Sequence, residues 1–506
     1  MIQGCGSDVG KSVLVAGLCR LFTQRGLSVR PFKSQNMSNN AAVTPGGGEI
    51  GRAQALQARA CRVAPSVDMN PILLKPQTDM GAQLIVRGKM AGTFDALAHG
   101  RDKRALLDVA VESYRTLERE CQLIVVEGAG SPAETNLRQH DIANMGLAHA
   151  LDLPVVLVGD INRGHVIASL VGAHVVLDSC DRARIRGFII NKFRGRVELF
   201  ADGMQRIVQH TGWAPIGIVP WLKAAGRLPS EDGMQLEPLR NLSGMDEPAA
   251  NTGGADRRIR IAVPQLSRIA NFDDFDPLRA EPNVDLAFIP PGRPLPADAA
   301  LIILPGTKAT IADLVFLREQ GWHIDLLAHV RRGGRVLGIC GGYQMLGHRL
   351  SDPHGIEGPV QSVEGMGLLD VETVMTGEKT LREVTGELTA FPSDRSDGGV
   401  ESPSARTFCG YEMHVGTTTG RGTSRPMLQF SDGTTDGAVS GDSRVAGCYV
   451  HGLFASPAAR AALLADMGTV SSGQDHSVGV DAALDEIAGM LEQCLDIGAL
   501  SRIAGL

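Results

Sequence analysis

The sequence predicts an α/β protein built from two doubly wound domains. Two observations favour this class: short apolar runs without polar alternation recur along the chain, and each is followed by a glycine-bearing turn and a helical pattern. Apolar runs separated by helices are typical of parallel strands that are covered on both faces. The alternation of apolar runs and helical patterns is interrupted over residues 240–257. These residues are polar and glycine-rich and are expected to link the two domains.

The first domain is expected over residues 1–239. Helical patterns begin at Gly10 and at Asp102. Buried strands are expected at CQLIVVEGAG from Cys121, LPVVLVGDI from Leu153, RGFIINKF from Arg186 and APIGIVPWL from Ala214. Only Met1–Gln3 precede the first glycine-rich loop, so either the true start lies upstream, which we favour, or the first strand is unusually short. Functional sites of such folds lie at the carboxyl ends of the strands.

The second domain is expected over residues 258–460, where the strand rhythm restarts. Its predicted strands lie in RIRIAVPQL, DLAFIP, ALIILPGTKAT and GRVLGICGG. The polar stretch FPSDRSDGGVESPSART, from Phe391, is expected to be a surface insertion. Residues 461–506 have helical periodicity and are expected to form a tail that packs on the second domain.

Composition excludes several classes of function. A net charge of -7 and an aromatic content of 4% argue against a nucleic-acid partner. No apolar stretch approaches the length of a membrane span, and the N-terminus lacks a signal-peptide pattern. The nine cysteines show no zinc-binding spacing. A cytoplasmic protein is therefore expected, and a homo-oligomer stays open.

The stretch GCGSDVGKS predicts a phosphate-binding loop for ATP. It places Gly4, Gly10, Lys11 and Ser12 directly before a helical pattern. Glycines let backbone N–H groups surround a phosphate, and the lysine neutralises its charge. Ser12 is expected to bind Mg²⁺. Five residues rather than the usual four separate the two glycines, and a chance glycine turn is the alternative.

Polar residues end two of the predicted strands. Glu127 in VVEGAG is expected to bind the metal, because a buried carboxylate is costly without such a partner. Its alternative is an exposed acid in a turn. Asn191 in IINKF is expected to pair with the adenine edge, with a turn asparagine as the alternative. Asp160 in VGDINRG is a weaker candidate for the same region.

The stretch GRVLGICGGYQMLG predicts a nucleophilic cysteine. Cys340 lies between an apolar strand and a helical pattern, and Gly338, Gly341 and Gly342 surround it. A nucleophile elbow needs such a strained turn, and the N-terminus of a helix favours the thiolate. A buried cysteine in a tight turn is the alternative.

A nucleophilic thiol requires a base and an oxyanion hole. We expect His451 in GCYVHGLF to be the base, because it ends an apolar run late in the same domain. His414 in GYEMHVG is the competitor. Backbone donors for the oxyanion are expected at Gly341 and at Gly306 and Thr307 of the LPGTK turn.

These residues resemble class I glutamine amidotransferase domains. The signature of those domains places a glutamate two positions after the histidine, where this chain has Leu453. The departure matches a subgroup that is fused to dethiobiotin synthetase-like ATPases, whose wide phosphate loop is similar to the one here. For this subgroup, a corrin-amidating family, the resemblance implies a cysteine–histidine pair.

Nearly the whole chain resembles this corrin-amidating family. DINRGHV differs from the family's D-x-D-R-G-G pattern at Asn162 and His165. The similar stretches are RPFKSQNMSNNAAVTPGGGEIGRAQALQARA from Arg30, VDMNPILLKPQTD, VVEGAGSPAETNLR, LPGTKATIADL and GICGGYQMLG.

The resemblance implies ATP-, Mg²⁺- and glutamine-dependent amidation of the peripheral b, d, e and g carboxylates of adenosylcobyrinic acid a,c-diamide. A row of amides with one cation suits such a carboxylate-rich substrate, and a solvated loop is the alternative. The residues expected to contact the substrate are Lys33, Gln35, Asn36, Asn39 and Asn40.

Two other functions stay open. One is the same chemistry at the a and c carboxylates of cobyrinic acid. The other is a nucleotide-switched regulatory ATPase whose second domain binds a ligand without catalysis.

Overall fold

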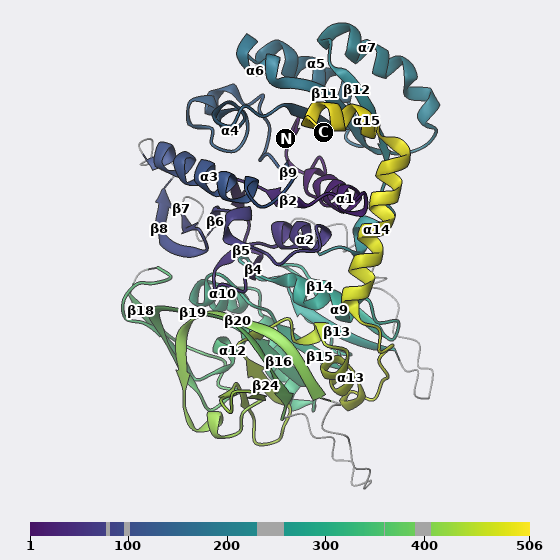
Figure 1. Ribbon diagram of the computed structural model, residues 1–506. Coiled ribbons are helices and arrows are strands. Elements are labelled where there is room, and N and C mark those ends of the chain that lie inside the picture. Colours follow the sequence, from purple (N-terminus) through teal and green to yellow (C-terminus); the bar gives the residue numbers. More distant parts are fainter. Residues whose placement is uncertain (77–80, 96–101, 230–257, 359, 390–405) are drawn as a thin grey trace. The chain divides into compact units, whose positions relative to one another are not determined.

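The computed structural model describes residues 1–76, 81–95, 102–229, 258–358, 360–389 and 406–506 (Figure 1). The chain divides into two compact units. One contains Met1–Ser38, Thr44–Pro229 and Gly479–Leu506, and the other contains Asn39–Val43 and Ser230–Val478. Both have mixed α/β architecture, which confirms the predicted fold class. The linker expected over 240–257, and the insertion expected from Phe391 through residue 405, lie outside the described residues.

Parallel strands form the centre of the first unit. A parallel pair, β2 (Val29–Phe32) and β9 (Leu123–Val126), adjoins β1 (Ile2–Gly4) through a bridge between Ile2 and Glu127. The four predicted strands are confirmed, and β1 has three residues. The four-stranded parallel sheet has the order β1 (Ile2–Gly4), β10 (Val155–Asp160), β11 (Ile185–Phe193) and β12 (Ala214–Pro220).

Helices cover both faces of this sheet. Because neighbouring strand residues point to opposite faces, Val156 and Val158 join one core while Val155 and Leu157 join another. The first core contains residues of α1 (Lys11–Gln24), α2 (Arg52–Ala60), α14 (His476–Cys494) and α15 (Ile497–Ala504). The second contains residues of α3 (Asp102–Glu118), α4 (Met145–Ala150), α5 (Val166–Val176) and α7 (Ala201–Thr211). A short helix, α6 (Ser179–Arg184), precedes β11.

Shorter strands complete the first unit. The β5 strand (Glu49–Gly51) precedes α2. A further sheet has the order β3 (Gln35–Met37), β6 (Ile72–Pro76), β7 (Gly81–Val86) and β8 (Lys89–Asp95).

The expected position of the C-terminal tail is wrong. Its helical character is confirmed, but Gly479–Leu506 belongs to the first unit rather than to the second domain. The apolar face of α14 enters the core that contains α1, where Leu484 and Ile487 are fully buried. Periodicity revealed the apolar face of the helix but not which domain covers it.

Truncating that face is expected to destabilise the first unit. Replacing Ile487 by alanine should lower the free energy of unfolding by about 2–4 kcal/mol, because the side chain is fully buried. Met490→Ala is the control, since Met490 lies on the same helix and is 36% exposed. Denaturant titration measures both variants. Equal stability of the two would contradict the packing of the tail.

The second unit contains a six-stranded sheet that is parallel except for one edge strand, β23 (Ala438–Val439). Its order is β14 (Val284–Ile289), β13 (Ile259–Pro264), β15 (Leu301–Leu304), β16 (Arg335–Ile339), β24 (Val445–Cys448) and β23 (Ala438–Val439). The four predicted strands of this domain are therefore confirmed. Its helices are α9 (Asp276–Arg279), α10 (Thr310–Glu319), α11 (Trp322–Arg331), α12 (Gly341–Leu346) and α13 (Pro457–Asp466).

A second sheet lies after α12 in the chain. Its antiparallel pair β20 (Thr407–Thr419) and β25 (Val450–His451) places Tyr411 opposite His451. The strands are β17 (Arg349–Asp352), β18 (Gln361–Glu364), β19 (Glu372–Leu388), β20 (Thr407–Thr419), β21 (Leu428–Phe430), β22 (Thr435–Asp436) and β25 (Val450–His451). The short strand β4 (Ala41–Val43) also groups with this unit. In the described part of the chain, no helix has the length and apolar character needed to cross a membrane.

Candidate active site

Cys340 occupies a strained turn between β16 and α12. Its φ of 52° and ψ of -111° lie in a region that residues with a Cβ rarely adopt. The turn is held by a hydrogen bond from the Cys340 amide to the carbonyl of Cys448, at 2.8 Å. The side chain is 8% exposed, and its sulfur lies 3.5 Å from the carbonyl oxygen of Met413. The geometry is that of a nucleophile elbow.

The neighbouring glycines allow backbone segments to approach closely. A Cβ on Gly342 would lie 2.1 Å from the carbonyl oxygen of Leu304, and one on Gly338 would lie 2.6 Å from the amide nitrogen of Tyr343. Side chains at these positions would prevent the strand and the helix from meeting at Cys340. The glycines therefore have a steric reason to surround the cysteine.

His451 is oriented by a carboxylate that lies far from it in sequence. Its Nδ1 lies 2.6 Å from Oδ2 of Asp274, in a 3-10 helix over Phe272–Phe275. The other oxygen of Asp274 accepts a hydrogen bond from the Gly452 amide at 2.8 Å. Because a carboxylate accepts, Nδ1 carries the proton and Nε2 is left for the thiol. Asp274 and His451 are 5% and 1% exposed.

The surroundings of His451 favour its protonated form. Burial alone would lower the pKa of the imidazole, but the charge and hydrogen bond of Asp274, followed by the hydrogen bond and charge of Cys340, raise it to about 10. A cationic imidazole beside a thiolate is the reactive state of a cysteine nucleophile. Cys340, His451 and Asp274 therefore form a candidate catalytic triad.

The competing histidine has a different environment. His414 on β20 stacks on Tyr449 with ring centroids 3.6 Å apart. Its burial, as the largest cause, lowers its pKa to about 4. A neutral imidazole packed on a tyrosine ring is a poorer partner for a thiolate than the cation at His451. The geometry thus favours His451 as the base.

The expected oxyanion donors lie beside the elbow. The amide nitrogen of Thr307 is 3.3 Å from the position that a Cβ on Gly341 would take. A Cβ on Gly306 would lie 2.9 Å from Cε1 of His451. The side chain of Thr307 is fixed by hydrogen bonds to the carbonyl of Arg268 and to Asp313. This arrangement brings the LPGTK turn to the nucleophile, as an oxyanion hole requires.

The phosphate loop of the first unit lies between β1 and α1. Lys11 donates hydrogen bonds to the carbonyls of Gly6, at 3.0 Å, and Gly130, at 3.1 Å. Gly10 has a φ of 92°, which favours glycine, and it directly precedes α1. The loop therefore has the backbone conformation and the lysine expected of a phosphate site.

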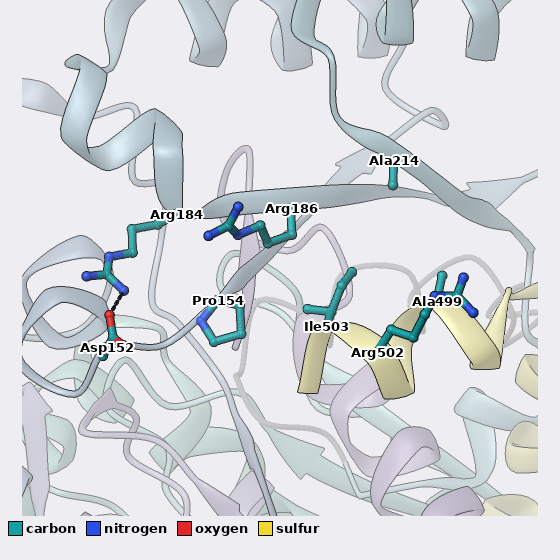
Figure 2. A pocket seen from close by; sticks show the side chains of 8 residues that line it. All are labelled: Asp152, Pro154, Arg184, Arg186, Ala214, Ala499, Arg502 and Ile503. Carbon is teal, nitrogen blue, oxygen red and sulfur yellow. Dashed lines mark hydrogen bonds and ion pairs between the residues drawn. The ribbon is translucent and has the colours of Figure 1, made fainter. Parts of the chain in front are cut away.

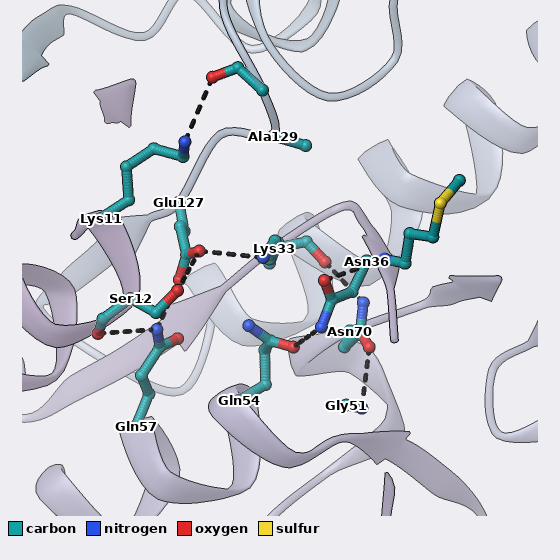
Figure 3. Close-up of polar contacts among 12 residues, drawn as sticks. Lys11, Ser12, Lys33, Asn36, Gly51, Gln54, Gln57, Asn70, Glu127 and Ala129 are labelled. Atoms are coloured by element: carbon teal, nitrogen blue, oxygen red, sulfur yellow. Dashed lines mark hydrogen bonds and ion pairs between the residues drawn. The ribbon is translucent and has the colours of Figure 1, made fainter. Parts of the chain in front are cut away.

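Glu127 is the centre of a buried polar network (Figure 3). Its Oε1 accepts a hydrogen bond from Ser12 Oγ at 2.8 Å and lies 2.9 Å from Lys33 Nζ. Its Oε2 accepts from Gln57 Nε2 at 2.6 Å. Glu127 is 1% exposed, so the alternative of an exposed turn acid is wrong.

The network contains hard oxygen donors that suit Mg²⁺. The expected pair, Ser12 and Glu127, is in direct contact. Gln57, which the sequence did not single out, adds a buried side-chain oxygen that has no hydrogen-bond partner in the described part of the chain. Hydroxyl, carboxylate and amide oxygens are the donors that Mg²⁺ prefers. These residues therefore fit the metal.

Asn191 lies against the phosphate loop. Its side-chain amide donates to the carbonyl of Val9 at 2.8 Å, and it is 4% exposed. Because one N–H is committed to the loop, Asn191 supports the loop itself. Its contact with adenine stays a prediction.

The residues expected to contact the substrate do not share one role. Lys33 is 6% exposed and pairs with Glu127. Asn36 is 3% exposed, its Nδ2 donates to Gln54 and its Oδ1 accepts from the Met37 amide, so its contact with the substrate stays a prediction. Gln35 is half-buried on β3. Asn39 and Asn40 group with the second unit.

The two departures from the D-x-D-R-G-G pattern occupy the turn after β10. The side-chain oxygen of Asn162 accepts a hydrogen bond from Arg194 at 3.0 Å, and the backbone amide of Asn162 donates to the carboxylate of Asp160 at 2.8 Å. His165 has a φ of 47° and precedes α5. Asp160 is paired with Lys192 at 3.1 Å. Asn162 thus has a structural partner of its own.

Comparison with known proteins decides the family. Residues 1–235 match the model of the CobQ/CobB/MinD/ParA nucleotide binding domain, and residues 260–459 match that of the CobB/CobQ-like glutamine amidotransferase domain. A cobyric acid synthase of Caulobacter sp. (strain K31) is 63% identical over 506 residues, which are 100% of this chain and 99% of that relative. The chain belongs to the cobyric acid synthase family.

Further cobyric acid synthases have similar coverage. Those of Rhizorhabdus wittichii and Sphingopyxis alaskensis are 57% and 58% identical over 504 residues, 100% of this chain and 98% of each relative. Among solved structures, the match to a glutamine amidotransferase covers 45% of this chain and 98% of the amidotransferase chain. The two are 14% identical, with a TM-score of 0.26. That likeness is too weak to add to the assignment to the cobyric acid synthase family.

Sequence reasoning missed two polar residues of these sites. Asp274 lies 177 positions before His451, and Gln57 lies 70 positions before Glu127. The signal for Asp274 was the run NFDDFDP, in which acidic residues interrupt apolar ones before a helix. For this member of the cobyric acid synthase family, Asp274 supplies the carboxylate that Leu453 cannot supply.

Proposed function

We propose that the chain uses ATP and glutamine to amidate the b, d, e and g carboxylates of adenosylcobyrinic acid a,c-diamide, giving adenosylcobyric acid in cobalamin biosynthesis. The observation that carries the proposal is the Cys340–His451–Asp274 triad in a chain that also has a phosphate loop. An ATP-activated carboxylate needs ammonia, and a thiol nucleophile releases ammonia from glutamine. Because the reaction consumes ATP, we place it in the cytoplasm.

The glutaminase steps use the second unit. Cys340 thiolate attacks the side-chain carbonyl of glutamine, and the amides of Thr307 and Gly341 stabilise the oxyanion. His451 gives its Nε2 proton to the departing ammonia and then takes a proton from the water that hydrolyses the thioester. Asp274 keeps the imidazole in the required tautomer throughout.

The synthetase steps use the first unit. A substrate carboxylate attacks the γ-phosphate of ATP, and ammonia then displaces phosphate from the acyl phosphate to give the amide. Lys11 holds the terminal phosphates and stabilises their charge. Ser12, Glu127 and Gln57 would hold Mg²⁺, which when bound neutralises charge on the transferring phosphoryl group. Lys33, beside Glu127, is poised to attract the carboxylate.

Glu127→Gln is expected to lower the affinity of the proposed metal site for Mg²⁺. The Mg²⁺ concentration that gives half-maximal amidation should rise about 10- to 100-fold, because one charged oxygen donor is lost. Titration of amidation with Mg²⁺ measures this change. Glu134→Gln, in an exposed position of the same unit, is the control. An unchanged Mg²⁺ dependence would remove Glu127 from the metal site.

A substrate assay tests the proposed function as a whole. The purified full chain is incubated with ATP, Mg²⁺ and glutamine, and with either adenosylcobyrinic acid a,c-diamide or cobyrinic acid. Mass spectrometry of the corrinoid should show four successive amidations of the a,c-diamide and none of cobyrinic acid. Amidation of cobyrinic acid alone would establish the a,c-diamide synthase instead. Glutamine-independent ATP hydrolysis without any amidation would indicate a regulatory ATPase.

A further inference from the structure

A cavity of about 510 Å³ opens on the first unit, away from the residues of the proposed reaction (Figure 2). It lies at the amino ends of neighbouring strands: Pro154 precedes β10, Arg186 is near the start of β11, and Ala214 begins β12. Ala499 and Ile503 of α15 form another side. Its volume falls within the range of about 300–1,000 Å³ that is usual for small-molecule sites.

The charge of the cavity is predominantly positive. Its lining contains three arginines and one aspartate, Asp152. Arg184 is paired with Asp152, and this contact is the main cause that lowers the pKa of Asp152. In the described part of the chain, the guanidinium groups of Arg186 and Arg502 make no hydrogen bond or ion pair with protein. The cavity therefore has two guanidinium groups ready for an anion.

The cavity is separate from the phosphate loop. Gly4 of that loop is the last residue of β1, and Asp160 is the last residue of β10, so both lie at the carboxyl ends of their strands. Pro154 lies before the amino end of the same strand. Six strand residues at about 3.3 Å each put roughly 20 Å between the two ends. An anion in the cavity would thus not be the ATP of the proposed reaction.

Chemistry and shape together define a class of ligand. An arginine binds phosphate or carboxylate through two parallel N–H groups. Pro154, Ala214 and Ile503 supply an apolar wall beside those groups. We propose that this cavity binds a small organic anion through Arg186 and Arg502, with a phosphate or carboxylate group at the arginines and an apolar part on the wall.

Arginine modification in the intact chain tests the proposal at single residues. The full chain is treated with phenylglyoxal, with or without phenyl phosphate or benzoate, and proteolytic peptides are analysed by mass spectrometry. At ten times its dissociation constant, the bound anion should slow modification of Arg186 and Arg502 about 10-fold. Arg206, exposed on α7 and outside the cavity, is the internal control. Protection by only one probe identifies the preferred anionic group.

A variant gives a second measurement. Arg186→Gln combined with Arg502→Gln should raise the dissociation constant of the protecting anion at least about 10-fold, measured by titration calorimetry in a Lys11→Ala background that weakens anion binding at the phosphate loop. Equal modification rates with and without both probes, or unchanged affinity in the double variant, would overturn the proposal. The modification readout uses neither glutamine nor a corrinoid, so its result is independent of the proposed amidation.

Discussion

Replacing Cys340 by alanine is expected to abolish amidation from glutamine while leaving amidation from ammonium salts intact. The thiolate is the only group of the triad that forms a bond with glutamine, so the glutamine-dependent kcat/KM should fall by about 10⁴-fold or more. Free ammonia needs no thiol, because the acyl phosphate is formed in the other unit. Parallel assays of corrinoid amidation with each nitrogen source measure the two activities.

Lys11→Ala is the matched control for this separation. The lysine lies in the phosphate loop, where it donates to Gly6 and Gly130. Its loss should reduce amidation from both nitrogen sources, because the acyl phosphate is no longer formed. If Cys340→Ala lost both activities, or kept both, Cys340 would not be the glutamine nucleophile. Circular dichroism of both variants controls for folding.

Local patterns predicted the nucleophile, its base and the phosphate loop. Cys340 lies in a run where strand, glycines and helix follow one another, so a short window carries the whole elbow. The neighbours of Glu127 were harder to predict from the sequence. Ser12 was expected there from motif and topology, but Gln57 reaches it from α2, a helix without any phosphate-site signature. Chain topology, rather than a local pattern, brings such pairs together.

The tail illustrates the same limit at the level of packing. Its periodicity defines an apolar face, and any exposed apolar surface of suitable shape can cover one. The polar contacts that distinguish the first unit are long-range: Asp481 on α14 pairs with Arg20 and Arg59. Neither arginine lies in a pattern that indicates a partner more than 400 positions away. Adjacency in sequence therefore favoured the wrong domain.

Replacing Asp274 by asparagine is expected to cause a large loss of glutaminase activity, although Asp274 itself does not touch glutamine. The amide cannot hold the Nδ1 proton as the carboxylate does, and its own N–H group can select the wrong tautomer of His451. Loss of the orienting carboxylate of such a triad typically costs kcat about 10²- to 10⁴-fold. Glutamate release from glutamine by the purified chain measures the effect.

The pH profile of the same variant distinguishes orientation from simple disruption. Burial disfavours the imidazolium, and Asp274 is the largest of the influences that raise the pKa of His451 to about 10. Without the carboxylate this pKa falls, so the thiolate–imidazolium pair is lost at a lower pH. The alkaline limb of kcat/KM should move toward neutral pH in Asp274→Asn. It should stay in place in Asp273→Asn, which removes the neighbouring carboxylate of the same 3-10 helix. A lower rate with an alkaline limb that stays in place would mean that Asp274 shapes the fold around His451 without setting the charge of the imidazole. The proposed triad would then reduce to the cysteine–histidine pair.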